Sequence, residues 1–149
     1  MRLVIDSNIF VSSLDPKDLF YSDCSLVFEK LLRSEIQAIC PLLVLVETIC
    51  VIRRRTNSEV ASKVYHNLIQ VPSINWLTID VETAKKACVL GCKIGLKGGD
   101  SIILQAAEQY NIPLLSNDKE IKSKTLDHVL VFEPKDLLKN NEPANWTQL

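Results

Sequence analysis

The feature that most constrains how this chain folds is the alternation of short, β-branched apolar runs with longer segments of helical periodicity. We predict strands at residues 3–6, 37–39, 75–79, 113–116 and 129–132, and helices at residues 23–34, 42–55, 59–70, 81–91 and 101–110. Strands that alternate with helices favour an α/β fold with a mostly parallel sheet, because parallel neighbours need a long crossover connection. The chain has 149 residues, enough for one domain and too few for a second full core.

Residues 42–52 are open to two interpretations, because their valines and isoleucines also suit a buried strand. The apolar pattern continues to Arg55 and exceeds ordinary strand length, which favours a helix. Asn57-Ser58 is predicted to supply the N-cap of the next helix, and Asp80 that of the helix after it. Gly91 lies near the end of that later helix and is a candidate for its C-cap.

Composition and charge argue against several classes of function. The chain is 47% hydrophobic and 23% charged, as soluble globular proteins are, and Glu47 interrupts its longest apolar stretch. We therefore expect neither a membrane-spanning helix nor, since the first residues read as a strand, a signal peptide. A net charge of −1 argues against a tight, metal-free binder of nucleic acid, but not against an enzyme that contacts phosphate through cations.

The cysteines are odd in number, scattered and set among apolar neighbours, which favours reduced, buried thiols in a cytoplasmic protein. They are Cys24, Cys40, Cys50, Cys88 and Cys92. Cys88 and Cys92 lie one helical turn apart, but no second pair and no histidine at zinc spacing accompanies them. That favours a place in the core over a zinc site. His66 and His128, the only histidines, are interpreted as structural or surface residues.

Acidic residues stand where two of the predicted strands end. Asp6 ends the first strand, and Asp118 comes just after the fourth. Ligands of open parallel sheets bind outside the carboxyl ends of the strands, so these carboxylates share an edge if the two strands are neighbours. Asn8 and Ser116 lie two residues from these acids and would point the same way in extended chain. Taken singly, each aspartate is equally an ordinary turn residue.

Two further acids stand in helical segments. Glu47 is the only charge among residues 42–52, and a buried carboxylate is costly unless it is paired, protonated or bound to metal. The alternative is a solvent-facing stripe that Glu47 shares with Arg54. Asp100 follows two glycines and opens a helix, so it suits an N-cap, although a helix N-terminus also attracts phosphate.

Four carboxylates that converged in one pocket would repel one another, and such a cluster is sensible only with a bound cation. Ligands that are all oxygen favour the hard ions Mg²⁺ or Mn²⁺ over zinc.

Four short motifs carry these acids in a fixed order along the chain: Ile5-Asp6-Ser7-Asn8, Val46-Glu47, Gly99-Asp100 and Leu115-Ser116-Asn117-Asp118. Together they resemble the PIN domain family of metal-dependent ribonucleases, which includes the VapC-like toxins of type II toxin–antitoxin pairs. The resemblance runs from about Arg2 to Phe132. It implies a three-layer α/β sandwich whose mostly parallel sheet has about five strands. Residues 1–133 would form the nuclease domain, and residues 134–149 a partly irregular C-terminal extension.

The resemblance also implies a site and an activity. Asp6, Glu47, Asp100 and Asp118 match the four acidic positions of the family, which bind metal and serve catalysis. Asn8 and Ser116 match supporting polar positions, the latter often threonine. The implied protein is an Mg²⁺- or Mn²⁺-dependent endoribonuclease that leaves 5′-phosphate and 3′-hydroxyl ends. It would be a homodimeric toxin held inactive by a small antitoxin. The alternatives are a solitary RNA-processing or decay nuclease and a non-catalytic PIN-like binding module.

Basic residues flank the acidic motifs and are candidates for RNA contact. We single out Arg53, Arg54, Lys97 and Lys119. Such residues would attract phosphate locally despite the neutral total. The alternative for the arginines is a solvated helix end that complements the helix dipole.

Overall fold

The computed structural model, described here for residues 1–125 and 127–139, contains a five-stranded sheet in which every pair of neighbours is parallel. The strand order is β3-β2-β1-β4-β5. The strands are β1 (Arg2–Ile5), β2 (Gln37–Pro41), β3 (Ile74–Leu77), β4 (Leu114–Leu115) and β5 (Val131–Phe132). Each overlaps a predicted strand, so the α/β fold class and the parallel sheet are confirmed.

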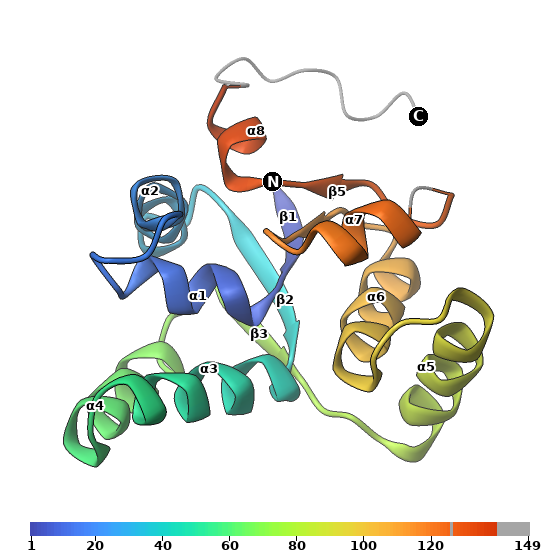
Figure 1. Cartoon of the computed structure of the whole chain (residues 1–149), viewed down its shortest axis with the longest axis horizontal. Coiled ribbons are helices and arrows are strands. Elements are labelled where there is room, and N and C mark those ends of the chain that lie inside the picture. The colour runs from blue at the N-terminus through green and yellow to red at the C-terminus, as the bar shows by residue number, and fades with distance from the viewer. Residues whose placement is uncertain (126, 140–149) are drawn as a thin grey trace.

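Eight helices connect and cover these strands within the described residues. They are α1 (Ser7–Ser13), α2 (Tyr21–Leu32), α3 (Leu42–Arg55), α4 (Ser58–Leu68), α5 (Val81–Ile94), α6 (Gly98–Tyr110), α7 (Lys119–Lys124) and α8 (Pro134–Lys139). Figure 1 shows β1, β2 and β3 running between α1–α4 on one side and the paired helices α5 and α6 on the other. The predicted helix over residues 42–55 is confirmed, and none of the helices in the described part of the chain is long and apolar enough to cross a membrane.

Burial on both faces explains why the central strands are continuously apolar rather than alternating. Leu3, Val4 and Ile5 of β1 are all fully buried, as are Leu114 and Leu115 of β4. The register pairs Val4 with Leu114 and Ile5 with Leu115. The two strands therefore end side by side, and the chain leaves both at the carboxyl edge of the sheet.

Three helices were not predicted from the sequence: α1, α7 and α8. They are short, with seven, six and six residues, so apolar periodicity has too little length to reveal them. Local signals existed nonetheless. Asp118 caps α7, and Pro134 stands at the first position of α8, where proline is favoured. The helix α8 packs against α2 and buries Pro134 and Leu137.

The predicted N-caps are confirmed. Asn57 accepts a hydrogen bond from the Val60 amide, and Asp80 accepts one from the Thr83 amide. The C-cap predicted at Gly91 was wrong. The helix α5 runs three residues further, to Ile94, and its C-cap is Gly95, whose φ of 76° is left-handed. Gly91 instead lies within α5, where a Cβ would collide with the Ser101 hydroxyl of α6. Its role is close helix packing.

The prediction of buried cysteines holds for Cys24 and Cys40 and was wrong for Cys50, Cys88 and Cys92, which are exposed on their helices. Apolar neighbours in sequence do not share a helix face, so the thiols of α3 and α5 point to solvent. Trp146, a further residue noted in the sequence, lies outside the described residues.

Candidate active site

The site begins at Asp6, which follows β1 at the carboxyl edge of the sheet and is 5% exposed. Three side chains donate to its carboxylate. The Ser116 hydroxyl and the Asn8 amide each lie 2.6 Å from Oδ2, and the Ser7 hydroxyl lies 3.3 Å from Oδ1. The sequence suggested that Asp6 and Asn8 share one face of an extended chain, and this was wrong. A helix begins at Ser7, and its first turn returns Asn8 to the carboxylate.

Ser116 and Asn8 connect the ends of β1 and β4. The Ser116 hydroxyl accepts hydrogen bonds from the Asn8 amide at 3.1 Å and from the backbone N–H of Asp118 at 3.0 Å. The Asn8 carbonyl oxygen accepts from the backbone N–H of Asn117 at 3.3 Å. Ser116 is fully buried, so these bonds are shielded from water. The two candidate supporting residues thus hold Asp6 and the backbone of Asp118 in one hydrogen-bonded unit.

Asp118 is the N-cap of α7. Its Oδ1 accepts from the backbone N–H groups of Glu120 at 2.7 Å and Ile121 at 3.4 Å. This cap fixes one of the two carboxylate oxygens of Asp118. Asp118 is therefore both a capping residue, as its turn position suggested, and a candidate site residue.

Asp100 and Glu47 come from two other helices and meet the same edge. Asp100 is the third residue of α6, after Gly98 and Gly99, so its predicted N-cap alternative was wrong: Lys97 holds the cap position. Asp100 Oδ2 is buried and has no hydrogen-bond partner among the described residues. Glu47 is partly buried on α3, and its Oε1 would lie 2.8 Å from a Cβ at position 99. Its carboxylate therefore faces the first turn of α6.

Electrostatics tie the four acids together. Burial raises the pKa of Asp6, against the hydrogen bonds from Ser116 and the Asn8 and Ser7 backbone that lower it. Burial also raises the pKa of Asp100, from 3.8 to about 6, and the negative charges of Asp6, Asp118 and Glu47 add to that rise. The Lys97 cation opposes it. The charges of the other three acids thus act on Asp100, which is consistent with the predicted gathering of these residues.

Because the pKa of Asp100 is raised, we expect the free energy of unfolding to depend on pH when divalent cations are absent. The folded protein keeps a proton on Asp100 up to about pH 6, whereas the unfolded chain releases it near 3.8. The folded state thus binds more protons between those values, so the free energy of unfolding should fall as pH rises through this window. Asp100→Asn removes the group that titrates and should flatten that part of the profile. The charged groups that face Asp100, and so set its pKa, are Asp6, Asp118, Glu47 and Lys97. Urea unfolding in EDTA from about pH 4 to about pH 7 measures the slope; equal slopes for both proteins would contradict the prediction.

The donor set fits a hard divalent cation by its chemistry. It is all oxygen, and it includes Asp100 Oδ2, which is buried and has no hydrogen-bond partner among residues 1–125 and 127–139. The Glu47 carboxylate lies beside Gly99, the residue before Asp100. In residues 1–125 and 127–139, however, no three histidine, cysteine, aspartate or glutamate side chains stand in an arrangement that could hold a metal ion as they are. Shared coordination therefore requires the carboxylates to move toward one another from these positions.

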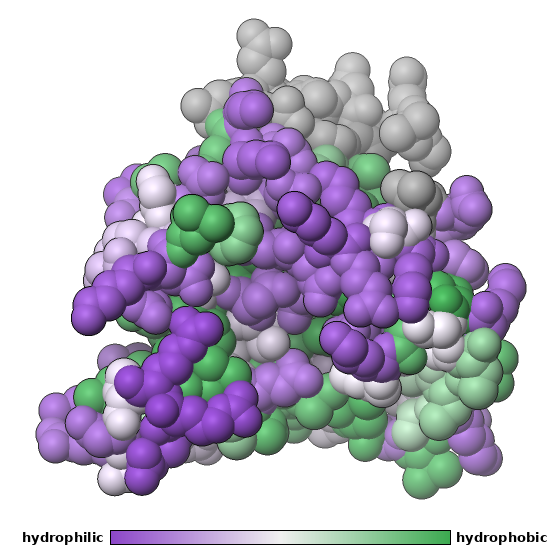
Figure 2. Space-filling view, in the orientation of Figure 1, coloured by the Kyte–Doolittle hydropathy of each residue, from purple (hydrophilic) through white to green (hydrophobic). Residues whose placement is uncertain are grey.

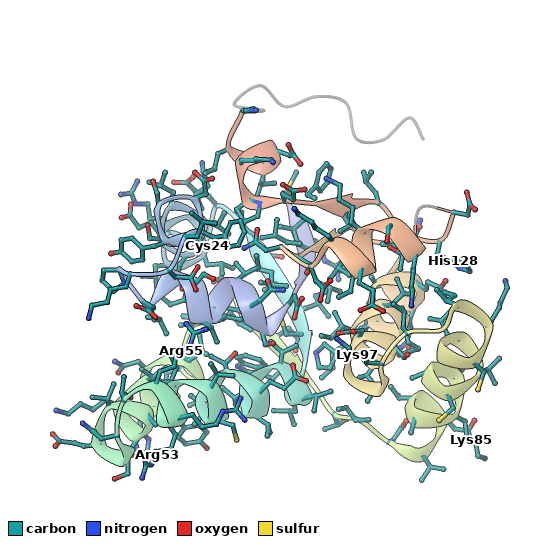
Figure 3. All side chains as sticks on the ribbon, viewed as in Figure 1. Cys24, Arg53, Arg55, Lys85, Lys97 and His128 are labelled. Atoms are coloured by element: carbon teal, nitrogen blue, oxygen red, sulfur yellow. The ribbon has the colours of Figure 1, made fainter. Side chains whose placement is uncertain are left out.

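The candidate RNA-contacting cations lie at different distances from the acids. Lys97 precedes the first turn of α6 and pairs with Glu120 at 3.6 Å, which places it beside the site (Figure 3). Arg53 lies at the far end of α3 in the same view, and Arg54 lies seven residues or roughly 10 Å along the helix from Glu47. Arg53, Arg54 and Lys119 are exposed. The structure thus brings Lys97 to the acids and leaves the two arginines at the helix end.

Arg55 has a role that the sequence did not predict. Its Nη1 lies 3.1 Å from Asp15 Oδ2 and 3.4 Å from Asp18 Oδ2, so it joins the end of α3 to the α1–α2 loop. Figure 2 shows hydrophilic residues gathered over α7 and over this end of α3 and α4. No sequence signal marks the pairing, because the partners are about forty residues apart.

A cavity of about 760 Å³ lies at the opposite, amino-terminal edge of the sheet, away from the four acids. Met1, Arg2, Pro113 and His128 are among its lining residues. His128 Nδ1 lies 2.8 Å from Glu108 Oε1, in keeping with a structural or surface role. The four acids do not line this cavity. We therefore place the candidate site at the carboxyl edge of the sheet, where the acids lie.

Comparison with known proteins agrees with this fold. The chain resembles VapC20 of Mycobacterium tuberculosis, described as a sarcin–ricin loop cleaving toxin, at 11% identity and a TM-score of 0.68, covering 81% of this chain and 93% of that one. It also resembles VapBC2 of Rickettsia felis, solved on a promoter DNA fragment (14%, TM-score 0.64, 89% and 98% covered), and FitAcB of Neisseria gonorrhoeae (17%, 0.64, 91% and 99%). No curated protein matches the sequence. The PIN domain family model matches residues 3–125, and the chain therefore belongs to the PIN domain family of nucleases.

Proposed function

We propose that this protein is an endoribonuclease that requires Mg²⁺ or Mn²⁺ and hydrolyses phosphodiester bonds to 5′-phosphate and 3′-hydroxyl ends. The observation that carries the proposal is the gathering of Asp6, Glu47 and Asp118 around Asp100, whose pKa their charges and its burial raise to about 6. Like charges held this close favour a cation between them. Retention of all four acids also speaks against a purely non-catalytic binding module.

In the proposed site Asp6, Glu47, Asp100 and Asp118 would hold the divalent cation, which when bound would supply the positive charge that lowers the pKa of water and offsets the negative charge that develops on the phosphate. The protein's own part is orientation. Ser116 and Asn8 fix Oδ2 of Asp6, and the α7 cap fixes Oδ1 of Asp118, so the orientation of these two carboxylates is set before substrate binds.

We propose that the Lys97 cation neutralises the negative charge of an RNA phosphate next to the point of cleavage. It stands between Asp100, whose pKa it lowers, and the exposed surface, and its side chain is largely exposed. A lysine there offers a cation to a phosphate next to the bound metal. Arg53, Arg54 and Lys119 would contact the strand further from the point of cleavage.

The decisive experiment measures cleavage of end-labelled single-stranded RNA with Mg²⁺, with Mn²⁺ and with excess EDTA. We expect cleavage with either ion and none with EDTA, because four carboxylates without a cation repel the phosphate and offer no positive charge to stabilise the transition state. A product that accepts ligation at its 5′-phosphate and lacks a 2′,3′-cyclic phosphate would support the proposed ends. Undiminished cleavage in EDTA would refute the metal-dependent mechanism.

We further propose that the protein is the toxin of a toxin–antitoxin pair and that a small antitoxin protein binds it. The support is the likeness to VapC20, described as a toxin, and to the VapBC2 complex, although identities of 11% and 14% show the fold alone. Induced expression in a permissive bacterium should arrest growth, and Asp6→Asn should abolish the arrest. Growth that continues at high expression of active enzyme would favour a solitary processing or decay nuclease instead.

The proposed oligomeric state, cellular compartment and domain bounds follow from the resemblance to the PIN domain family. We propose a homodimer that acts in the cytoplasm, with the nuclease domain in residues 1–133 and a C-terminal extension in residues 134–149. Sedimentation of the full chain tests the oligomeric state.

A further inference from the structure

Glu47 lies on α3 and Asp100 on α6, so the Glu47 side chain must extend from one helix toward the other for both carboxylates to hold one cation. The carboxylate of Glu47 faces the first turn of α6 at Gly99. A Cβ at position 99 would lie 2.8 Å from Glu47 Oε1 and 3.9 Å from Glu47 Cδ. Real Cβ atoms essentially never approach an oxygen this closely, so a side chain at 99 and the present position of Glu47 exclude each other.

The neighbouring glycine provides a contrast. A Cβ at Gly98 would meet nothing within 4 Å. Neither residue has a positive φ, because among the described glycines only Gly95 does. Both stand in the first turn of α6, where backbone conformation would admit alanine. Only Gly99 therefore has a spatial reason to lack a side chain, and that reason is the Glu47 carboxylate.

We infer that Gly99 is a positioning residue: the absence of a side chain at 99 leaves the space in which the Glu47 carboxylate faces the first turn of α6, the position from which it would join Asp100 in holding the cation. This inference rests on the proposed function. The nearest atoms of the neighbour are the far end of a flexible side chain, with Leu43 Cδ2 at an ordinary 3.6 Å. A methyl group at 99 therefore moves the carboxylate and leaves the α3–α6 backbone packing as it is.

That distinction separates positioning from structural support. Alanine has a higher helix propensity than glycine, so both Gly98→Ala and Gly99→Ala should keep or raise the melting temperature of the metal-free protein. A glycine needed for packing would instead lower it when replaced. Only Gly99→Ala should weaken the binding of a divalent cation, because only there is a proposed ligand displaced.

The experiment is a calorimetric titration of the full chain with Mn²⁺, together with thermal unfolding in EDTA, for wild type, Gly99→Ala and the matched control Gly98→Ala. We expect Gly99→Ala to bind Mn²⁺ at least about tenfold more weakly, in the range seen when groups that orient metal ligands are lost. Gly98→Ala should bind as wild type does. Equal affinity in all three proteins, or a lower melting temperature of Gly99→Ala alone, would overturn the inference.

A double-mutant cycle with Glu47→Gln identifies the group that Gly99 acts through. If Gly99 acts on the carboxylate of Glu47, adding Gly99→Ala to Glu47→Gln should change Mn²⁺ affinity by much less than it does in wild type. Independent, additive losses would overturn the assignment. Failure of the proposed function looks different, because wild type itself would then neither bind Mn²⁺ at one site nor cleave RNA.

Discussion

Replacing Asp100 with asparagine is expected to reduce metal-dependent RNA cleavage by at least about a hundredfold, the upper range for groups that only support a metal ligand. The same change should leave the folded protein at least as stable near neutral pH. Asp100 Oδ2 is buried without a partner among the described residues, and three neighbouring carboxylates repel its charge. A neutral isostere removes that repulsion and also removes a cation ligand. Loss of activity and gain of stability would thus come from one substitution.

The measurements are kcat/KM on a labelled RNA and the free energy of unfolding in urea with EDTA. Asp127→Asn is the matched control, because Asp127 is exposed and lines the cavity at the opposite edge of the sheet. It should change neither quantity. Cleavage by Asp100→Asn at the wild-type rate would exclude Asp100 from the metal site.

Replacing Ser116 with alanine is expected to destabilise the protein by about 1–3 kcal/mol, the usual result of leaving buried polar groups without a partner. The fully buried hydroxyl donates to Asp6 Oδ2 and accepts from the backbone N–H of Asp118, so both lose a partner at once. Because this donation lowers the pKa of Asp6, its loss should raise that pKa further. Divalent cations would then compete less well with protons, and cleavage should need a higher pH.

Ser116→Thr is the control, since it keeps the hydroxyl and the family resemblance implies threonine at this position. Urea unfolding and the pH profile of cleavage should both stay close to wild type for threonine and change for alanine. Alanine and threonine variants that behave alike in both measurements would show that the hydroxyl does not hold the site.

Much of the fold was accessible from local patterns. Short β-branched runs predicted strands that overlap all five observed ones, and the long apolar segment at 42–55 was a helix as its length indicated. After Arg2, β1 has no polar alternation because its residues are buried on both faces, and the same holds for β4. Caps at Asn57 and Asp80 were predictable for the same local reason, since a side chain that bonds a backbone N–H three residues on needs nothing from the rest of the protein.

Errors arose where burial or helix length depends on distant neighbours. Cys50, Cys88 and Cys92 are exposed because of which face their helices turn to solvent, and Gly91 does not cap α5 but gives room to Ser101 of the next helix. Neither the face nor the neighbour is encoded in the surrounding few residues. Arg55 likewise joins Asp15 and Asp18 across about forty residues of sequence.

The sequence by itself determined that two acids follow strand ends, one stands in the first turn of a helix and one, Glu47, lies within a helix, in an order typical of the PIN domain family. The sequence placed Asp6 and Asp118 at one edge only on the condition that their strands are neighbours, and the parallel pairing of β1 with β4 meets that condition. Only the tertiary structure decided how Glu47 and Asp100 join them. Their approach depends on how α3 and α6 are placed at that edge and on the missing side chain of Gly99, and such packing is a property of the assembled core rather than of any segment.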